Sequence, residues 1–253
     1  MRAIWSGSIS FGLVNIPVKL YSATESKGLD FRMLHKKHLT PIKYQKWCPE
    51  CEAEVPYAEI VKGIEIRKDE YIPITPEELK ALRPQKSNTV DVREFVDTHQ
   101  IDPIYYSKHY YLAPNKAGEK AYFLFREVLS TSAKAAICTF IMREKEQVCA
   151  VRPYKNGLVL STLNYAYEVR SIDQIEELKK PAKLTKEELD LASQLINRLY
   201  KEEFDISEFK DNFADEVKKI IERKSEGEEI EVEAAIKKPK AKPLIEALKA
   251  SLK

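Results

Sequence analysis

The sequence predicts a mainly β protein with a few helices in its body and two amphipathic helices near its C-terminus. Three observations predict this fold class. Several short stretches are apolar on alternate residues or throughout, which is typical of half-buried and fully buried strands. Short polar segments separate them, so we expect a closed or nearly closed β structure. After Pro181 the apolar residues recur every three or four positions, the period of an amphipathic helix.

The first strand is predicted over residues 13–20, where Val14, Ile16 and Val18 share one face. Pro17 donates no ladder hydrogen bond, so we expect this strand to lie at a sheet edge or to end in a bulge. Further strands are predicted over residues 89–96, 104–112, 135–142, 148–154 and 158–163, with the polar residues 143–147 closing a hairpin.

Two helices are predicted within this β body. Thr75, followed by Pro76 and Glu78, forms a capping box with proline at the first helical position, so a helix begins there. The second helix is predicted over residues 118–129, with Ala121, Phe125 and Val128 near one face.

The segment 181–228 is predicted to form a helical hairpin. Thr185 and Glu188 form a capping box that begins its first helix, and Ser207 is expected to cap the second, which ends near Gly227. The apolar residues of the two helices are Leu189, Ala192, Leu195, Ile196 and Leu199, then Phe209, Phe213, Val217, Ile220 and Ile221. Residues 229–253 are expected to form a flexible basic tail that ends in a short amphipathic segment.

The composition excludes several classes of protein. With 253 residues, 43% of them hydrophobic, the chain can bury a sizeable core. It contains no apolar run of about 18 residues, the length that a membrane span requires. No cationic segment followed by an apolar stretch stands at the N-terminus, so we expect no signal peptide and a cytoplasmic protein.

The net charge of +2 conceals an uneven distribution. Residues 1–172 contain 25 basic and 20 acidic side chains, residues 173–233 contain 11 and 19, and residues 234–253 contain 6 and 1. An acidic module therefore lies between a basic body and a basic tail. Because acidic side chains repel a phosphate backbone, this layout indicates that the module and the body have separate tasks.

No convincing catalytic constellation is present in the sequence. It contains no GxxxxGK[ST], GxGxxG, GxSxG or HExxH motif. The acidic pairs of Glu77 with Glu78 and of Glu187 with Glu188 stand in first helical turns, where capping and the helix dipole account for them. We therefore expect a protein that is not an enzyme.

Four cysteines are expected to be reduced thiols. Cys138 and Cys149 lie in apolar strand-like runs and are expected to be buried. Cys48 and Cys51 form a CxxC knuckle, the spacing that structural zinc uses, but zinc needs two further ligands. His35 and His38, or a second knuckle from a symmetric dimer, are the alternatives for these ligands; otherwise the knuckle is a tight turn with free thiols.

Residues 27–47 carry the strongest electrostatic signal. They contain six basic side chains and Asp30 as their single acid, interleaved with His35, His38, Tyr44 and Trp47. Lysine and arginine neutralise phosphates without requiring that any base be read. The stretch therefore indicates nucleic-acid binding, with a solvated loop as the alternative.

Many ordered motifs resemble those of the prokaryotic Ku family, the DNA-end-binding factors of non-homologous end joining. The N-terminal signature is MRAIWSGSISFGLVNIPVKLYSA at residues 1–23. The likeness continues in LHKK (34–37), CPEC (48–51), VPY (55–57), IVKG (60–63), ALRP (81–84), DPIYY (102–106), YYLAP (110–114), GEKAY (118–122) and LIEALKASL (244–252). The resemblance thus covers nearly the whole chain.

The resemblance implies a Ku-type β-barrel core over residues 1–180, with an extended arm at about 27–70 that forms half of a dimeric ring. Such a homodimer threads onto double-stranded DNA ends, protects them and recruits the ATP-dependent DNA ligase D. It would act at DNA breaks in the nucleoid. Arg32, Lys36, Lys37, Lys43 and Lys46 are the candidate channel residues, with Lys108 as a further one, and Leu244, Ile245 and Leu248 are the candidate ligase-recruiting residues.

Two alternatives remain from the residues themselves. One is a general nucleic-acid-binding β-barrel protein without end specificity, which would bind duplex along its length. The other is an enzyme with an unrecognised site. Dependence of binding on free DNA ends separates the first alternative from the ring.

Overall fold

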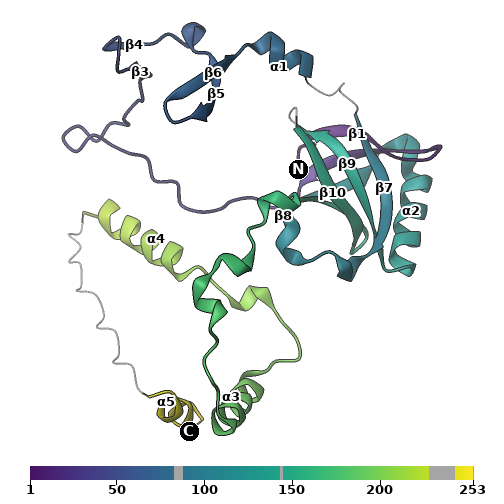
Figure 1. Ribbon diagram of the computed structural model, residues 1–253, viewed down its shortest axis with the longest axis vertical. Helices are drawn as coiled ribbons and strands as arrows, with labels where there is room; N and C mark the ends of the chain where they lie inside the picture. Colours follow the sequence, from purple (N-terminus) through teal and green to yellow (C-terminus); the bar gives the residue numbers. More distant parts are fainter. Residues whose placement is uncertain (83–87, 143–144, 228–242, 253) are drawn as a thin grey trace. The chain divides into compact units, whose positions relative to one another are not determined.

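A computed structural model of the protein describes residues 1–82, 88–142, 145–227 and 243–252 (Figure 1). The chain separates into two compact units. One contains Met1–Lys27 and Phe31–Arg170, and the other contains Gly28–Asp30 and Ser171–Lys253. Among the described residues, no helix is both long enough and apolar enough to span a membrane.

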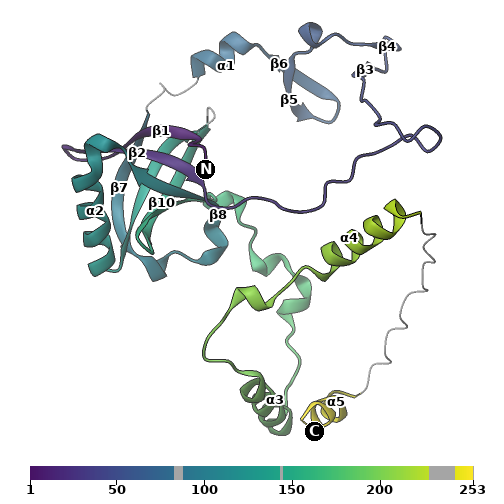
Figure 2. The same ribbon diagram turned by 180° about the vertical axis from the view of Figure 1, so that it is seen from behind.

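The first unit contains a closed seven-stranded barrel (Figures 1 and 2). Its strands are β1 (Trp5–Phe11), β2 (Val14–Ser22), β7 (Thr89–Asp97), β8 (Tyr106–Pro114), β9 (Lys134–Met142), β10 (Lys145–Tyr154) and β11 (Gly157–Leu163). They follow each other around the barrel in the order β1, β2, β8, β11, β10, β9, β7, and the parallel pairing of β7 with β1 closes it. The predicted mainly β fold with additional helices is confirmed.

Inward-facing residues of all seven strands fill the barrel, because side chains alternate between the two sides of a strand. The core includes Ile9, Ile16, Val18, Leu20, Val90, Leu112, Cys138, Phe140, Cys149, Val151, Leu158 and Leu160. Cys138 and Cys149 are fully buried, as expected, and lie opposite each other on β9 and β10. Strand β10 begins at Lys145, so the predicted connection 143–147 is too long, and its residues 143 and 144 lie outside the described residues.

Pro17 lies within a strand that is paired on both sides, so the prediction of a sheet edge or a bulge is wrong. The reason is the direction of the backbone groups. Ser8, opposite Pro17 on β1, donates its N–H away from β2, to the Asn88 carbonyl at 3.0 Å. On the other side, the ladder with β8 starts at Val18, and the Pro17 carbonyl accepts the Asn115 N–H at 2.9 Å. Proline therefore removes no ladder hydrogen bond here.

Helix α2 (Glu119–Thr131) runs alongside the barrel and packs against β2, β9, β10 and β11 (Figures 1 and 2). Its buried side chains are Tyr122, Phe125 and Leu129. Val128 is 54% exposed, but it lines an apolar cavity together with Ala121 and Phe125. The three residues therefore lie near one face of the helix, as predicted.

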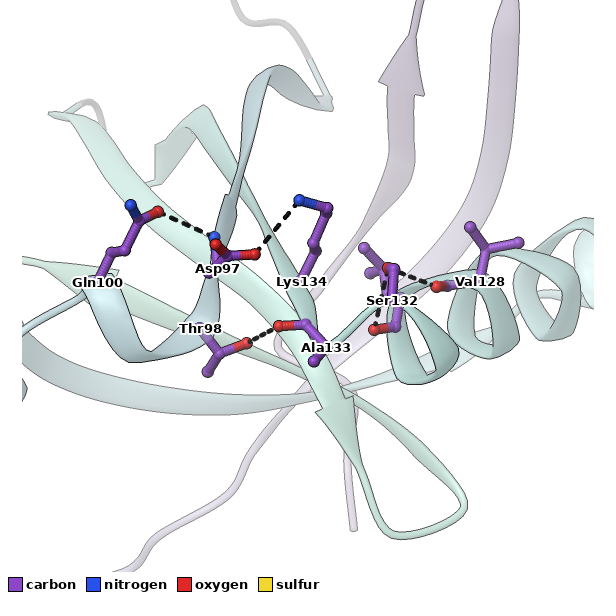
Figure 3. A network of polar contacts seen from close by, with 8 residues as sticks. Asp97, Thr98, Gln100, Val128, Ser132, Ala133 and Lys134 are labelled. Carbon is purple, nitrogen blue, oxygen red and sulfur yellow. Dashed lines mark hydrogen bonds and ion pairs between the residues drawn. The ribbon is translucent and has the colours of Figure 1, made fainter.

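The connection from α2 into β9 is fixed by polar contacts with the end of β7 (Figure 3). Ala133 adopts a left-handed conformation with φ 53°, and its carbonyl accepts the N–H of Thr98 at 3.2 Å and the Thr98 hydroxyl at 3.1 Å. Lys134 Nζ lies 3.3 Å from Asp97 Oδ1, and the Asp97 N–H donates to Gln100 Oε1 at 3.1 Å. The contacts of Thr98 with Ala133 and of Asp97 with Lys134 join segments more than thirty residues apart.

The connection between β2 and β7 contains two small hairpins and a helix. They are β3 (Trp47–Cys48) with β4 (Ala53–Glu54), β5 (Lys62–Arg67) with β6 (Glu70–Ile74), and α1 (Pro76–Leu82). The predicted capping box of α1 is confirmed, since Thr75 Oγ1 accepts the Glu78 N–H at 3.2 Å and Glu78 Oε2 accepts the Thr75 N–H at 2.8 Å. The two hairpins were not predicted.

The second unit contains α3 (Lys186–Leu199), α4 (Asn212–Ser225) and α5 (Leu244–Ser251). Thr185 and Glu188 form the predicted capping box of α3. Asp211, not Ser207, caps α4, because its Oδ1 accepts the Ala214 N–H at 3.0 Å, while Ser207 lies in a 3₁₀ turn. A hairpin of α3 with α4 was predicted, but α3 packs against α5. Most of the predicted tail, residues 228–242, lies outside the described residues.

Short 3₁₀ turns complete the described secondary structure. They span Tyr57–Glu59, Thr98–Gln100, Pro103–Tyr105, Lys116–Gly118, Ala166–Glu168, Ile172–Gln174, Glu176–Lys179 and Ile206–Glu208.

Candidate nucleic-acid interface

A closed loop presents the first pair of candidate lysines. Leu34 and Pro41 form an isolated β-bridge at its base, and the His35 N–H donates to the Thr40 carbonyl at 2.9 Å. His35 Nδ1 accepts the N–H groups of Lys37 and His38 at 3.2 and 3.3 Å, and the two histidine rings stack with centroids 4.9 Å apart. Lys36 and Lys37 therefore lie at the tip of a hydrogen-bonded loop, with their side chains exposed.

The five candidate cations of the arm (residues 27–70) are all exposed: Arg32, Lys36, Lys37, Lys43 and Lys46. Within the part of the chain that the structure describes, none of the five forms an ion pair with a carboxylate. Lys27 differs, because its ammonium group lies 2.8 Å from Glu25 Oε1, which raises the lysine pKa. Exposed cations without carboxylate partners are free to neutralise phosphates.

Lys46 is held in position by contacts of both its side chain and its backbone. Its ammonium nitrogen lies 4.0 Å from the centroid of the Tyr57 ring, and its carbonyl accepts the Val55 N–H at 2.8 Å. A cation held over an aromatic ring gains some stabilisation from the electrons of the ring. Tyr44 and Trp47 are exposed beside it in the sequence, so the arm offers aromatic as well as basic surface.

The CxxC knuckle forms the turn of the β3–β4 hairpin, with Glu52 in a left-handed conformation at φ 48°. Hydrogen bonds from the backbone and thiol of Cys51 and from the backbone of Glu50 lower the pKa of Cys48. The pKa of Cys51 is raised, first because its thiol donates to the Cys48 sulfur. The two thiols are thus joined by a hydrogen bond, and Cys48 loses its proton more readily than Cys51.

The knuckle supplies two thiols, half of the ligands that structural zinc takes. No group of three or more His, Cys, Asp or Glu side chains among the described residues is arranged to hold a metal ion. His35 and His38 stack on each other in their own loop. Their contribution to a zinc site stays a prediction, as does that of a second knuckle from a symmetric dimer.

Lys108 lies in the barrel unit, at the start of β8. Its side chain is exposed, and its backbone N–H donates to Thr162 Oγ1 at 3.0 Å. The adjacent His109 is half-buried, with Nδ1 2.8 Å from Ser161 Oγ. Lys108 therefore belongs to the barrel surface and the other five cations to the arm.

The candidate ligase-recruiting residues lie on α5. Leu244 is 56% exposed, whereas Ile245 and Leu248 are half-buried in this helix, which packs on α3. Lys249 Nζ lies 2.8 Å from Glu187 Oε1, and Arg198 donates to the Leu252 carbonyl at 2.7 Å. Only part of the predicted apolar segment is therefore free to contact another protein.

The β5–β6 hairpin carries an apolar surface that sequence reasoning missed. Ile64 on β5 lies directly opposite Ile72 on β6, and both are more than half exposed. Ile66 on β5 is also exposed, whereas Tyr71, opposite Glu65, is exposed on the other face of the hairpin. The alternation of Ile64 and Ile66 with charged neighbours was the signal that could have revealed the strand.

The fold and these surfaces define a class of protein: a seven-stranded β-barrel with an exposed arm between β2 and β7, basic over residues 27–47. The Ku family, described as the Ku70/Ku80 beta-barrel domain, matches residues 10–191. The protein named Non-homologous end joining protein Ku from Archaeoglobus fulgidus is 42% identical over 252 residues, which cover 100% of this chain and 98% of the relative. The chain therefore belongs to the Ku family.

Bacterial relatives show the same similarity. The Non-homologous end joining protein Ku of Heliobacterium modesticaldum is 42% identical, with 100% of this chain and 91% of the relative covered. That of Bacillus subtilis is 38% identical, with coverage of 100% and 82%.

Proposed function

We propose that the protein is a non-enzymatic homodimeric ring that threads onto double-stranded DNA ends, protects them and recruits an end-joining ligase. Its relatives are named for non-homologous end joining, which supports a role at DNA ends. The observation that carries the proposal is the exposed arm, whose five candidate cations have no carboxylate partner among the described residues.

Contacts to phosphates account for binding without sequence specificity. The candidate cations belong to a loop and an extended segment, and phosphates are the same along any duplex. A ring whose channel contacts only phosphates slides along DNA, because no base-specific contact has to break. It cannot load on covalently closed DNA, so end specificity follows from the closed shape and needs no chemical recognition of the terminus.

A second copy of the chain supplies the other half of the ring in this proposal. The exposed apolar surface of Ile64 and Ile72 on the arm supports it, since apolar surface of this kind is typical of interfaces. A two-fold axis would bring the same hairpin of each copy to the interface.

The helical unit is proposed to recruit the ATP-dependent DNA ligase D in the cytoplasm, where the chromosome is repaired. Its net negative charge keeps it from competing with the basic body for DNA. Competition between linear and covalently closed DNA tests the end-binding proposal, and loss of ligase stimulation on truncation tests the recruiting one.

A further inference from the structure

A polar cleft of about 730 Å³ lies on the barrel, where β8, β10 and β11 meet the segment that follows β11. Its lining includes Lys108, Lys145, Gln147, Asn164, Tyr165 and Tyr167, and we call it the tyrosine cleft. Nothing in the arm contributes to it, so the cleft is separate from the candidate cations of residues 27–70.

Two tyrosines form a preassembled stack in this cleft. The rings of Tyr165 and Tyr167 are nearly parallel, at 7°, with centroids 5.4 Å apart. Tyr165 is anchored, because Glu168 Oε2 accepts its N–H at 2.7 Å and the Glu146 carbonyl accepts its hydroxyl at 3.4 Å. Tyr167 is 82% exposed, so a second planar group can extend the stack. Neither ring belongs to the barrel core.

The charges around the stack do not suit a duplex. Among the described residues of the lining, the cations Lys108 and Lys145 are matched by the carboxylates of Glu146 and Glu168. Affinity at this cleft must therefore come mainly from stacking. Bases in a duplex are already stacked on each other, whereas unpaired bases expose their faces to aromatic side chains.

We propose that the tyrosine cleft binds unpaired nucleotides of single-stranded DNA, such as the overhang of a broken end. A base stacks on Tyr167, Lys108 and Lys145 contact the adjoining phosphates, and the amides of Gln147 and Asn164 lie within the same cleft for base edges. Its use on an overhang rests on the proposed end binding, but the cleft would bind a free single strand without it.

Fluorescence anisotropy of the full-length protein tests this site with three probes: a blunt duplex, the same duplex with an oligo(dT) overhang, and oligo(dT) alone. The overhang should strengthen duplex binding, and Tyr167→Ala should weaken binding of both oligo(dT)-containing probes by about 5-fold or more, the lower value for one base–aromatic stack. Affinity for the blunt duplex should not change. Tyr200→Ala, which removes another exposed tyrosine, is the matched control.

Two further variants separate stacking from folding. Tyr167→Phe keeps the aromatic face and should retain binding, whereas Glu146→Gln removes a negative charge from the cleft and should strengthen it. Unchanged oligo(dT) binding in Tyr167→Ala would overturn the proposal, as would an equal loss on the blunt duplex. If the wild type binds the two oligo(dT)-containing probes equally well but not the blunt duplex, the end-binding proposal fails while the cleft stands.

Discussion

The hydroxyl of Tyr122 connects helix α2 to two strands of the barrel. It donates to the Leu112 carbonyl at 2.6 Å and accepts the Leu158 N–H at 2.8 Å, and the side chain is only 2% exposed. A buried polar group left without its partner costs about 1–3 kcal/mol. One hydroxyl therefore satisfies a donor and an acceptor that water cannot reach.

Replacing this residue by Tyr122→Phe should lower the free energy of unfolding by about 1–3 kcal/mol at neutral pH, as measured by urea denaturation. Burial raises the pKa of Tyr122, so the folded protein keeps this proton where the unfolded chain loses it. The associated stability is complete below the unfolded pKa of about 10 and is lost as the pH rises through the folded value. The variant should therefore lose less stability above that pH than the wild type, and parallel pH profiles would contradict this.

The two knuckle cysteines should differ in reactivity because the thiolate is the nucleophile. The hydrogen bonds that lower the pKa of Cys48 should make it react with iodoacetamide before Cys51 near neutral pH. Peptide mass spectrometry after brief alkylation measures the order, and the buried Cys138 and Cys149 serve as unreactive controls. Equal labelling of Cys48 and Cys51 would show that these hydrogen bonds do not form in solution.

At the level of elements, burial decided which strands could be predicted from sequence. Strands such as β9 and β11 have long apolar runs because most residues on both of their faces are buried or half-buried. Strand β1 was missed although Trp5, Ile9 and Phe11 alternate with small polar residues, because serine and glycine hid the pattern. The arm hairpins are exposed on both faces, so no core imposes a period on their sequence.

Local capping chemistry was the more reliable signal for helices. The boxes at Thr75 and Thr185 use neighbours three residues away, so sequence alone locates them. Asp211 was missed because Ser207 offers the same kind of side chain four residues earlier. The packing of α3 with α5 depends on contacts between segments far apart in the chain, which no local pattern contains.

The part of the candidate site that consists of exposed cations could be predicted from the sequence, because charge alone defines it. The cations of the arm are exposed as a binding surface requires, but the loop that closes around Lys36 and Lys37 depends on backbone bonds such as that of His35 with Thr40. The tyrosine cleft could not be predicted, because it brings Lys108 together with residues of three later segments.

The arm should lose DNA affinity when its charge is reversed. The double variant Lys43→Glu and Lys46→Glu should bind DNA ends more weakly, and the slope of log affinity against log salt should become shallower by about 2, one for each lost phosphate contact. Titration over a range of salt concentrations measures both effects. The double variant Lys218→Glu and Lys219→Glu on α4 carries the same charge change and is the control. An unchanged slope would remove Lys43 and Lys46 from the interface.

On the scale of the whole molecule, the two units allow binding and recruitment to be separated. The barrel has its own core and ends before Arg170, so a chain truncated after residue 180 should fold. It should bind linear DNA with nearly the affinity of the full chain and should fail to stimulate ligation by the partner ligase. Gel shifts and a ligation assay measure these two outcomes. Full stimulation by the truncated chain would place recruitment in the barrel unit instead.

The central claim is that the protein encloses DNA and enters at an end. The most direct test is a gel-shift competition in which a labelled linear duplex is challenged with unlabelled linear DNA or with the same mass of covalently closed circle. A threading ring predicts that the linear competitor displaces the probe and the circle does not. Equal competition by both would contradict the ring and leave a barrel protein that binds duplex DNA along its length.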